Sequence, residues 1–305
     1  MSHGPRTEPL RIGTRGSRLA VAQTLTVAEM IEDATGGVAE LVRVRTEGDD
    51  LSIPLSAPPR PGAFAARLRD VLSAGDVDVA VHSFKDLPFA PEPGLRVVAV
   101  PRRASALDAL VSRDRLGLAE LPAGARVGTS SPRRAAALLR ARPDLEIVPI
   151  RGNVDTRVRK VRTGEVDAAV LAAAGLQRID RGEEITAPID PAVIVPAPAQ
   201  GALAVEMRAD HPMADAVGAI DDADTRLRVT AERQVLTGVQ ATCTTAVGAH
   251  SELDGRTLRL VADLSGHLGV DYARVEVSAE LGDDPLADAV ALGRRAASEL
   301  LAGAR

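Results

Sequence analysis

A chain of 305 residues is longer than one ordinary hydrophobic core needs, so two or three domains are expected. The net charge of −5 argues against a nucleic-acid scaffold, and the single cysteine excludes an internal disulfide. The sequence has no apolar run of the ~18 residues that span a bilayer, no apolar signal region and no metal-ligand cluster of Cys and His. A cytoplasmic protein is therefore expected.

Strand-like and helix-like segments alternate through the first two thirds of the chain, which predicts an α/β architecture. The predicted strands cover residues 10–14, 40–46, 77–82, 126–128, 146–150 and 166–171. The predicted helices cover residues 17–33 and 62–74, and two more begin at Ser131 and Asn153. The Pro-rich stretch 188–198 is interpreted as a connection between domains.

The last third has a different pattern, which predicts a separate and smaller α+β domain. A helix is predicted over 224–239, strands over 258–264 and 272–279, and a final helix over 285–302. The spacing of the final helix places Leu286, Val290, Ala297 and Leu300 on one face.

A weak internal repeat is visible in the α/β region. RIGTRGSR (11–18) resembles RVGTSSPR (126–133), and GDVDVAV (75–81) resembles GEVDAAV (164–170). The gaps between the paired elements differ, so chance similarity remains the alternative. Duplication of one α/β unit would place two such units around a cleft, where ligands commonly bind.

Arginine stands at three strand-to-helix junctions, although a helix N-terminus favours acidic side chains. The junction residues are Arg15 before a cap at Ser17, Arg133 and Arg134 after a cap at Ser131, and Arg151 and Arg157 around Asn153. The carboxyl ends of strands in open α/β sheets are where ligands bind. These arginines therefore predict a polyanion site; the alternative is a set of solvated surface groups.

Two further segments carry reactive side chains. VHSFKDLP (81–88) brings Lys85 and Asp86 to the end of a predicted buried strand, where they are either a functional pair or a structural ion pair. Cys243 lies in ATCTTAVG (241–248), among threonines typical of a loop. An accessible thiol is one interpretation, and a small buried apolar side chain is the other.

Together the motifs resemble the hydroxymethylbilane synthase (porphobilinogen deaminase) family from about residue 10 to the C-terminus. The matching segments, in family order, are RIGTRGSRLA (11–20), VHSFKDLP, GTSSPRR (128–134), RGNVDTR (151–157), LAAAGLQR (171–178), PAPAQGALAVE (196–206), LRVTAER (227–233) and the Cys243 loop. The resemblance implies two periplasmic-binding-protein-like (type II) α/β domains around a cleft, plus a smaller C-terminal α+β domain. Their implied ranges are 1–101 with 197–221, 102–196, and 222–305.

The resemblance also implies an activity. Family members are transferases of tetrapyrrole, porphyrin and heme biosynthesis. They deaminate four porphobilinogen molecules, join them head to tail on a dipyrromethane cofactor held by a thioether, here to Cys243, and release hydroxymethylbilane by hydrolysis. The implied protein is a cytoplasmic monomer whose partner is porphobilinogen, with no metal, nucleic acid or membrane.

Family roles carry over onto matching positions of this sequence. Asp86 matches the catalytic aspartate. The implied cofactor-binding residues are Cys243, Lys85, Ser83, Thr129, Ser131, Arg133, Arg134, Arg157 and Gln200. The implied substrate-binding residues are Arg15, Ser17, Phe64, Arg151 and Arg178. Each pyrrole carries two carboxylates, which accounts for many arginines in a protein of negative net charge.

One segment departs from the family pattern, and two other classes of protein stay open. Residues 57–64, APPRPGAF, replace a glycine-rich segment that often contains Lys, so Arg60 is expected to supply the cation of a lid. The main alternative is a non-enzymatic two-domain anion-binding or regulatory protein, which needs neither Cys243 nor Asp86. A nucleic-acid-binding protein is the second alternative, and the scarcity of aromatic residues argues against it.

Overall fold

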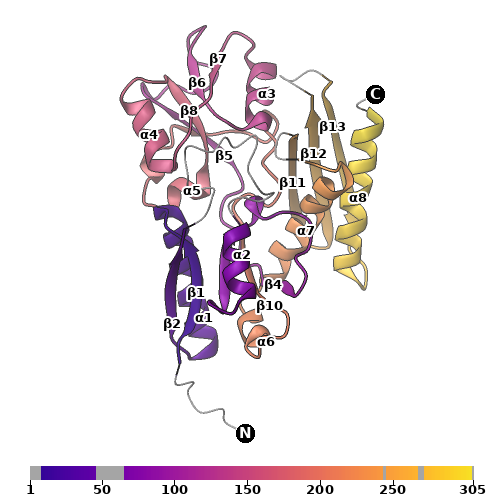
Figure 1. The fold of residues 1–305 in the computed structure, drawn as a ribbon. Coiled ribbons are helices and arrows are strands. Elements are labelled where there is room, and N and C mark those ends of the chain that lie inside the picture. Colours follow the sequence, from indigo (N-terminus) through magenta and orange to yellow (C-terminus); the bar gives the residue numbers. More distant parts are fainter. Residues whose placement is uncertain (1–7, 46–64, 243–244, 267–270, 304–305) are drawn as a thin grey trace. The chain divides into compact units, whose positions relative to one another are not determined.

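The computed structural model describes residues 8–45, 65–242, 245–266 and 271–303 (Figure 1). The chain forms two compact units: unit 1 comprises residues 1–103 and 202–226, and unit 2 comprises residues 104–201 and 227–305. Across the described ranges, no helix is both long enough and apolar enough to cross a membrane. The predicted lid with Arg60 and Phe64, and the thiol of Cys243, lie outside the described residues.

Unit 1 is built on a five-stranded sheet with the order β2-β1-β3-β10-β4. Its strands are β1 (Leu10–Arg15), β2 (Ala39–Val44), β3 (Val79–Ser83), β4 (Leu95–Ala99) and β10 (Leu203–Arg208), and its helices are α1 (Arg18–Thr35), α2 (Ala66–Ser73) and α6 (Ala214–Gly218). β1 runs parallel to β2 and β3, whereas β10, from much later in the chain, runs antiparallel to β3 and β4. Aliphatic side chains of α1, such as Val27 and Ile31, pack on this sheet.

The first sheet of unit 2 repeats this arrangement, with the order β7-β6-β8-β5-β9. Its strands are β5 (Asp108–Ser112), β6 (Arg126–Gly128), β7 (Glu146–Val148), β8 (Ala168–Ala172) and β9 (Ala187–Pro188), and its helices are α3 (Pro132–Ala141), α4 (Val154–Arg162) and α5 (Ala173–Gln177). β6 runs parallel to β7 and β8, and β5 runs antiparallel to β8 and β9. Both sheets thus carry one antiparallel strand at the same place, which confirms the expected α/β fold class.

Matching hydrogen bonds show that the internal repeat is structural. In unit 1 the backbone N–H of Arg11 donates to Asp78 and its guanidinium to the carbonyl of Gly75. In unit 2 the backbone N–H of Arg126 donates to Asp167 and its guanidinium to the carbonyl of Gly164. The paired sequence motifs therefore occupy equivalent positions in the two sheets.

The C-terminal part of unit 2 contains a three-stranded antiparallel sheet, β11 (Ala246–Asp254), β12 (Thr257–Ser265) and β13 (Ala273–Glu280). The helices α7 (Ala223–Gly238) and α8 (Pro285–Gly303) share its core. The expected apolar face of α8 is partly wrong, because Leu286 is 46% exposed. Ala297 and Leu300 are buried as expected. They share the buried face with Ala289, Leu292 and Ala296, and the small Gly293 lets α8 approach α7 closely.

Candidate functional site

The carboxyl ends of β1 and β3 bring several predicted site residues together in unit 1. The two strands are parallel neighbours, so Arg15, the last residue of β1, reaches the same edge as Ser83, the last residue of β3. A 3₁₀ turn, Phe84–Asp86, follows β3 directly. Arg15, Ser83 and Asp86 line one hollow, as the pattern of strand ends predicts.

The groups around this hollow differ in what they contact. The hydroxyl of Ser83 donates to the side-chain carbonyl oxygen of Gln23 at 3.0 Å. The hydroxyl of Ser17 accepts from the backbone N–H of Ala20 at 3.2 Å and so caps α1. Asp86 is exposed and ends the 3₁₀ turn that follows β3.

A buried charged cluster lies beneath the hollow, and the sequence analysis missed it. Glu206 on β10 is 2% exposed and accepts hydrogen bonds from Nε and Nη2 of Arg69 of α2, the shortest at 3.0 and 2.8 Å. His82, which also lines the hollow, has its Nε2 3.3 Å from Glu206. Although burial acts to raise it, the pKa of Glu206 is lowered, because His82 and Arg69 both stabilise the carboxylate.

The carboxyl ends of β6, β7 and β8 form a second edge, in unit 2. These three strands are parallel neighbours, so the segments that follow them emerge on the same side. The predicted residues at this edge are Thr129, Ser131, Arg133 and Arg134 after β6, Arg151 and Arg157 after β7, and Arg178 after β8. The sequence thus places every predicted arginine of unit 2 at one sheet edge.

Local capping explains why the helices begin here. The hydroxyl of Ser131 accepts from the backbone N–H of Arg134 at 3.5 Å, and Pro132 occupies the first helical position of α3. The side-chain oxygen of Asn153 accepts from the backbone N–H of Thr156 at 2.9 Å and begins α4. Both caps were predicted from the sequence, and both are confirmed.

The cationic groups at this edge are held in different ways. Arg157 donates from Nε to the carbonyl of Gly152 at 2.8 Å. Arg178 donates to the carbonyl of Gly201 at 2.7 Å, and burial lowers its pKa to about 10. Arg178 therefore stays protonated at neutral pH and can pair with a carboxylate.

Arg133 and Arg134 point to an internal carboxylate. Arg133 Nη1 lies 2.7 Å from Asp108 Oδ2, and Arg134 Nη2 lies 2.7 Å from Asp108 Oδ1. The side-chain nitrogen of Gln200 donates to the same Asp108 Oδ1 at 3.0 Å. Asp108, which no motif indicated, thus joins three residues that the family resemblance assigns to cofactor binding.

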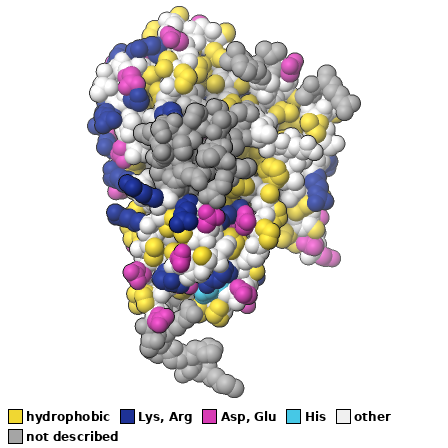
Figure 2. Space-filling view, viewed as in Figure 1, with side chains coloured by type: hydrophobic (Ala, Val, Ile, Leu, Met, Phe, Trp, Pro, Cys, Tyr) yellow, Lys and Arg dark blue, Asp and Glu magenta, His cyan; other side chains and the backbone are white. Residues whose placement is uncertain are grey.

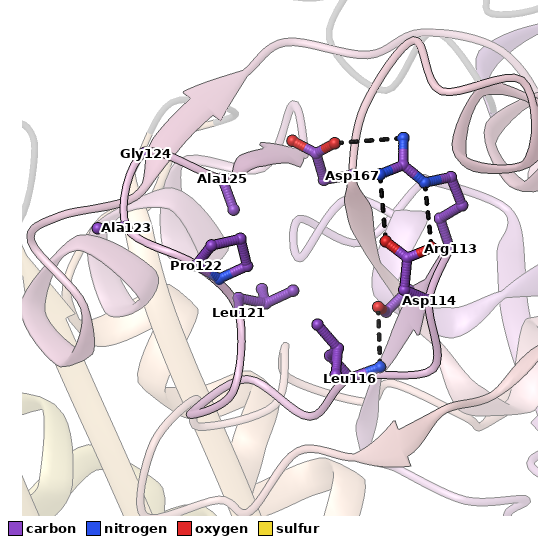
Figure 3. Close-up of a pocket in the computed structure, with 10 residues that line it drawn as sticks. Arg113, Asp114, Leu116, Leu121, Pro122, Ala123, Gly124, Ala125 and Asp167 are labelled. Carbon is purple, nitrogen blue, oxygen red and sulfur yellow. Dashed lines mark hydrogen bonds and ion pairs between the residues drawn. The ribbon is translucent and has the colours of Figure 1, made fainter.

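Figure 3 shows a different pocket of unit 2, with a volume of about 210 Å³. Gly124 and Ala125 precede β6, and Asp167 precedes β8, so this pocket lies at the opposite edge of the sheet from the arginines. Arg113 pairs with Asp114 and Asp167 within it. Its lining has one guanidinium and two carboxylates, which does not suit an anion, and it brings together none of the predicted site residues.

These donors fit a polycarboxylate. Guanidinium groups at the edge of unit 2 suit carboxylates, since each presents a planar fork of N–H donors. An accessible carboxylate at the edge of unit 1 suits a developing cation. Among the described residues, no group of His, Cys, Asp and Glu could hold a metal ion.

Fold and site together define a class: an α/β protein with two similar five-stranded sheets and charged groups at the carboxyl edge of each. The family model "Porphobilinogen deaminase, dipyromethane cofactor binding domain" matches residues 10–216, and "Porphobilinogen deaminase, C-terminal domain" matches residues 226–302. The chain belongs to the porphobilinogen deaminase family. Dipyrromethane is accordingly its cofactor, and its activity is that of a transferase, a hydroxymethylbilane synthase.

Curated relatives named porphobilinogen deaminase cover nearly the whole chain. The protein from Nocardia farcinica is 48% identical, over 96% of this chain and 86% of its own length. Those from Leifsonia xyli and Mycobacterium leprae are 47% and 46% identical, over 99% and 97% of this chain and 95% and 98% of their own lengths. A periplasmic substrate-binding protein of Coxiella burnetii aligns at 14% identity with a TM-score of 0.44, over 69% of this chain and 91% of its own.

Proposed function

We propose that this chain joins four porphobilinogen molecules head to tail and releases linear hydroxymethylbilane, with Asp86 as the catalytic carboxylate. The observation that carries the proposal is the meeting of Asp86, Arg15 and Ser83 at one hollow, on the carboxyl edge of unit 1. An exposed carboxylate beside an arginine suits a substrate that has carboxylate arms and becomes cationic as it reacts.

Asp86 acts on the pyrrole nitrogen of the substrate. Loss of ammonia from porphobilinogen places positive charge on that nitrogen, and a neighbouring carboxylate stabilises the charge. The same carboxylate can accept and return the pyrrole N–H proton during bond formation. Arg15 pairs with a substrate carboxylate and so holds the ring beside Asp86.

The second sheet edge holds carboxylates of the cofactor and of the growing chain. Cofactor contacts are assigned to Ser83, Lys85, Thr129, Ser131, Arg133, Arg134, Arg157, Gln200 and the covalent Cys243, and substrate contacts to Arg15, Ser17, Phe64, Arg151 and Arg178. When bound, dipyrromethane supplies a pyrrole carbon to which substrate units are added. The described members of these sets gather at the strand ends, whereas Phe64 and Cys243 are assigned on family resemblance.

Domain organisation, location and oligomeric state complete the proposal. The domains comprise residues 1–101 with 197–221, 102–196, and 222–305, and Cys243 belongs to the third. The protein acts as a cytoplasmic monomer, because a reducing compartment keeps its sole thiol available for a thioether. Porphobilinogen is its partner, and neither a metal, a membrane nor a nucleic acid takes part.

The surface is compatible with a small-molecule partner. On the described part of the face in Figure 2, acidic and basic side chains are interspersed and do not form one basic patch. A polynucleotide would favour a continuous basic surface.

The deciding experiment incubates the purified protein with porphobilinogen and follows both pyrrole consumption and ammonia release. We expect one ammonia per porphobilinogen consumed and a linear tetrapyrrole product that cyclises without further enzyme. Saturable binding of porphobilinogen with no ammonia release would instead establish a binding protein.

A further inference from the structure

We infer that Asp108 is a positioning residue, which sets the orientation and the net charge of the Arg133–Arg134 pair so that the pair can receive a carboxylate of the cofactor. The inference rests on the proposed function and adds a residue to its site. Arg133 and Arg134 are consecutive and 7% and 6% exposed, so two cations lie side by side with little water around them. Without a counterion, their mutual repulsion would be costly.

Asp108 is that counterion, and it is 0% exposed. Arg133 reaches it through one nitrogen, whereas Arg134 donates to it through both Nε and Nη2, at 3.0 and 2.7 Å. A bidentate contact fixes the plane of a guanidinium, and a single contact leaves other N–H groups for a ligand. One carboxylate between two guanidiniums leaves a net charge of about +1. The arginines also hold the pKa of Asp108 well below its usual range, so it remains ionised.

The backbone completes the support of both arginines. Arg133 Nη1 donates to the carbonyl of Val195 at 2.6 Å, and Arg134 Nη1 donates to the carbonyl of Val170 at 3.0 Å. Gln200 donates from one nitrogen to Asp108 and to the carbonyl of Ala106. Asp108 thus accepts hydrogen bonds from two segments, α3 and the segment at Gln200, while Val195 and Val170 hold the two arginines from the other side. Asp108 and its donors therefore form a preorganised group.

The duplicated sheet shows that the fold itself does not require this carboxylate. Asp108 is the first residue of antiparallel β5 and pairs with Ala172 at the end of β8. In unit 1 the first residue of antiparallel β10 is Leu203, which pairs with Ser83 at the end of β3. An apolar side chain thus fills the equivalent place, so Asp108 serves the arginine pair that is present only in unit 2.

The test compares Asp108→Asn with the parent chain and with Asp167→Asn. Asp167 is a matched control, because it pairs with Arg113 and Arg126 at the opposite edge of the same sheet. Each protein is prepared without the cofactor and incubated with porphobilinogen. Covalent loading is followed by intact mass, kcat and KM are measured on the loaded protein, and thermal unfolding is recorded.

We expect Asp108→Asn to load at least tenfold more slowly than the parent, and Asp167→Asn to load within twofold of it despite lower stability. If Asp108→Asn does not fold, the same loading measurement is made on Asp108→Glu. This variant keeps the charge but displaces the carboxylate by one methylene. Loading within twofold of the parent, in whichever Asp108 variant folds, overturns the inference. A parent chain that neither gains mass nor consumes porphobilinogen overturns the proposed function instead.

Discussion

At the residue scale, two carboxylates have opposite surroundings and therefore different tasks. Asp86 is exposed at a strand end, where an incoming cationic ring can meet it. Glu206, beneath it, is enclosed by Arg69 and His82 and has no room for a ligand. The position of each carboxylate relative to the sheet edge, rather than its residue type, is the reason for proposing catalysis by Asp86 and structural support by Glu206.

Asp86→Asn should keep the cofactor and lose turnover. The amide keeps the shape of the carboxylate but cannot neutralise a pyrrole cation, so the expected cost is about 3–4 kcal/mol, or 10²–10³ in rate. The intact mass of the variant measures cofactor retention, and kcat of the same preparation measures turnover. A loss of kcat below about fivefold would show that Asp86 is not the catalytic carboxylate.

Glu206→Gln should lower the free energy of unfolding of unit 1. It should also weaken the fall of that free energy as the pH is lowered. Because the pKa of Glu206 is lowered in the folded state, its contribution is fully present above the unfolded value of about 4.3 and is lost as the pH falls through the folded value. Removing one partner of a buried pair costs about 3–5 kcal/mol. The free energy of unfolding in urea is measured for the parent chain and for Glu206→Gln between about pH 3 and pH 7. A difference between the two proteins that does not change with pH would contradict the prediction.

At the element scale, the sequence predicts the strand ends well, because capping residues and buried strands leave local signals. Ser17, Ser131 and Asn153 begin the helices as expected. Asp108 and Glu206 carry no such signal. They lie on antiparallel strands whose partners are distant in sequence, so only the sheet topology brings them beneath the site.

The packing of α7 against α8 explains the error in the predicted face of α8. Periodicity selects apolar side chains, yet α8 also approaches α7 closely at Gly293, which has no side chain. A Cβ at this position would overlap the carbonyl of Ala231 and the side chain of Gln234. A glycine at a helix contact is thus the feature that a hydrophobic pattern does not detect.

Gly293→Ala should lower the free energy of unfolding by about 1–3 kcal/mol, since the added methyl overpacks the contact with α7. Gly303→Ala, in the same helix, is the control, because its Cβ meets Ala273 at an ordinary 3.7 Å. Thermal unfolding of the two variants is compared. Equal midpoints would show that α7 and α8 accommodate the methyl at no cost.

At the scale of the whole molecule, the charge distribution follows from the task. A chain of net charge −5 carries a set of arginines, among them Arg15, Arg133 and Arg151, after parallel strands of duplicated α/β sheets, where carboxylates of a pyrrole chain would bind. Duplication supplies two such edges from one sheet topology. The edges differ in Asp86 of unit 1 and in Asp108 with its arginine pair in unit 2, to which the proposals above give different roles. The C-terminal α+β part adds the cysteine.

The most direct test of the account is the intact mass of the purified chain and of Cys243→Ser. The account predicts that the parent weighs more than its sequence by two covalently attached pyrrole units, since Cys243 is its sole thiol. The serine variant should fold and match its sequence mass. A parent chain at its bare sequence mass after incubation with porphobilinogen, or a serine variant that keeps the added mass, would contradict the account.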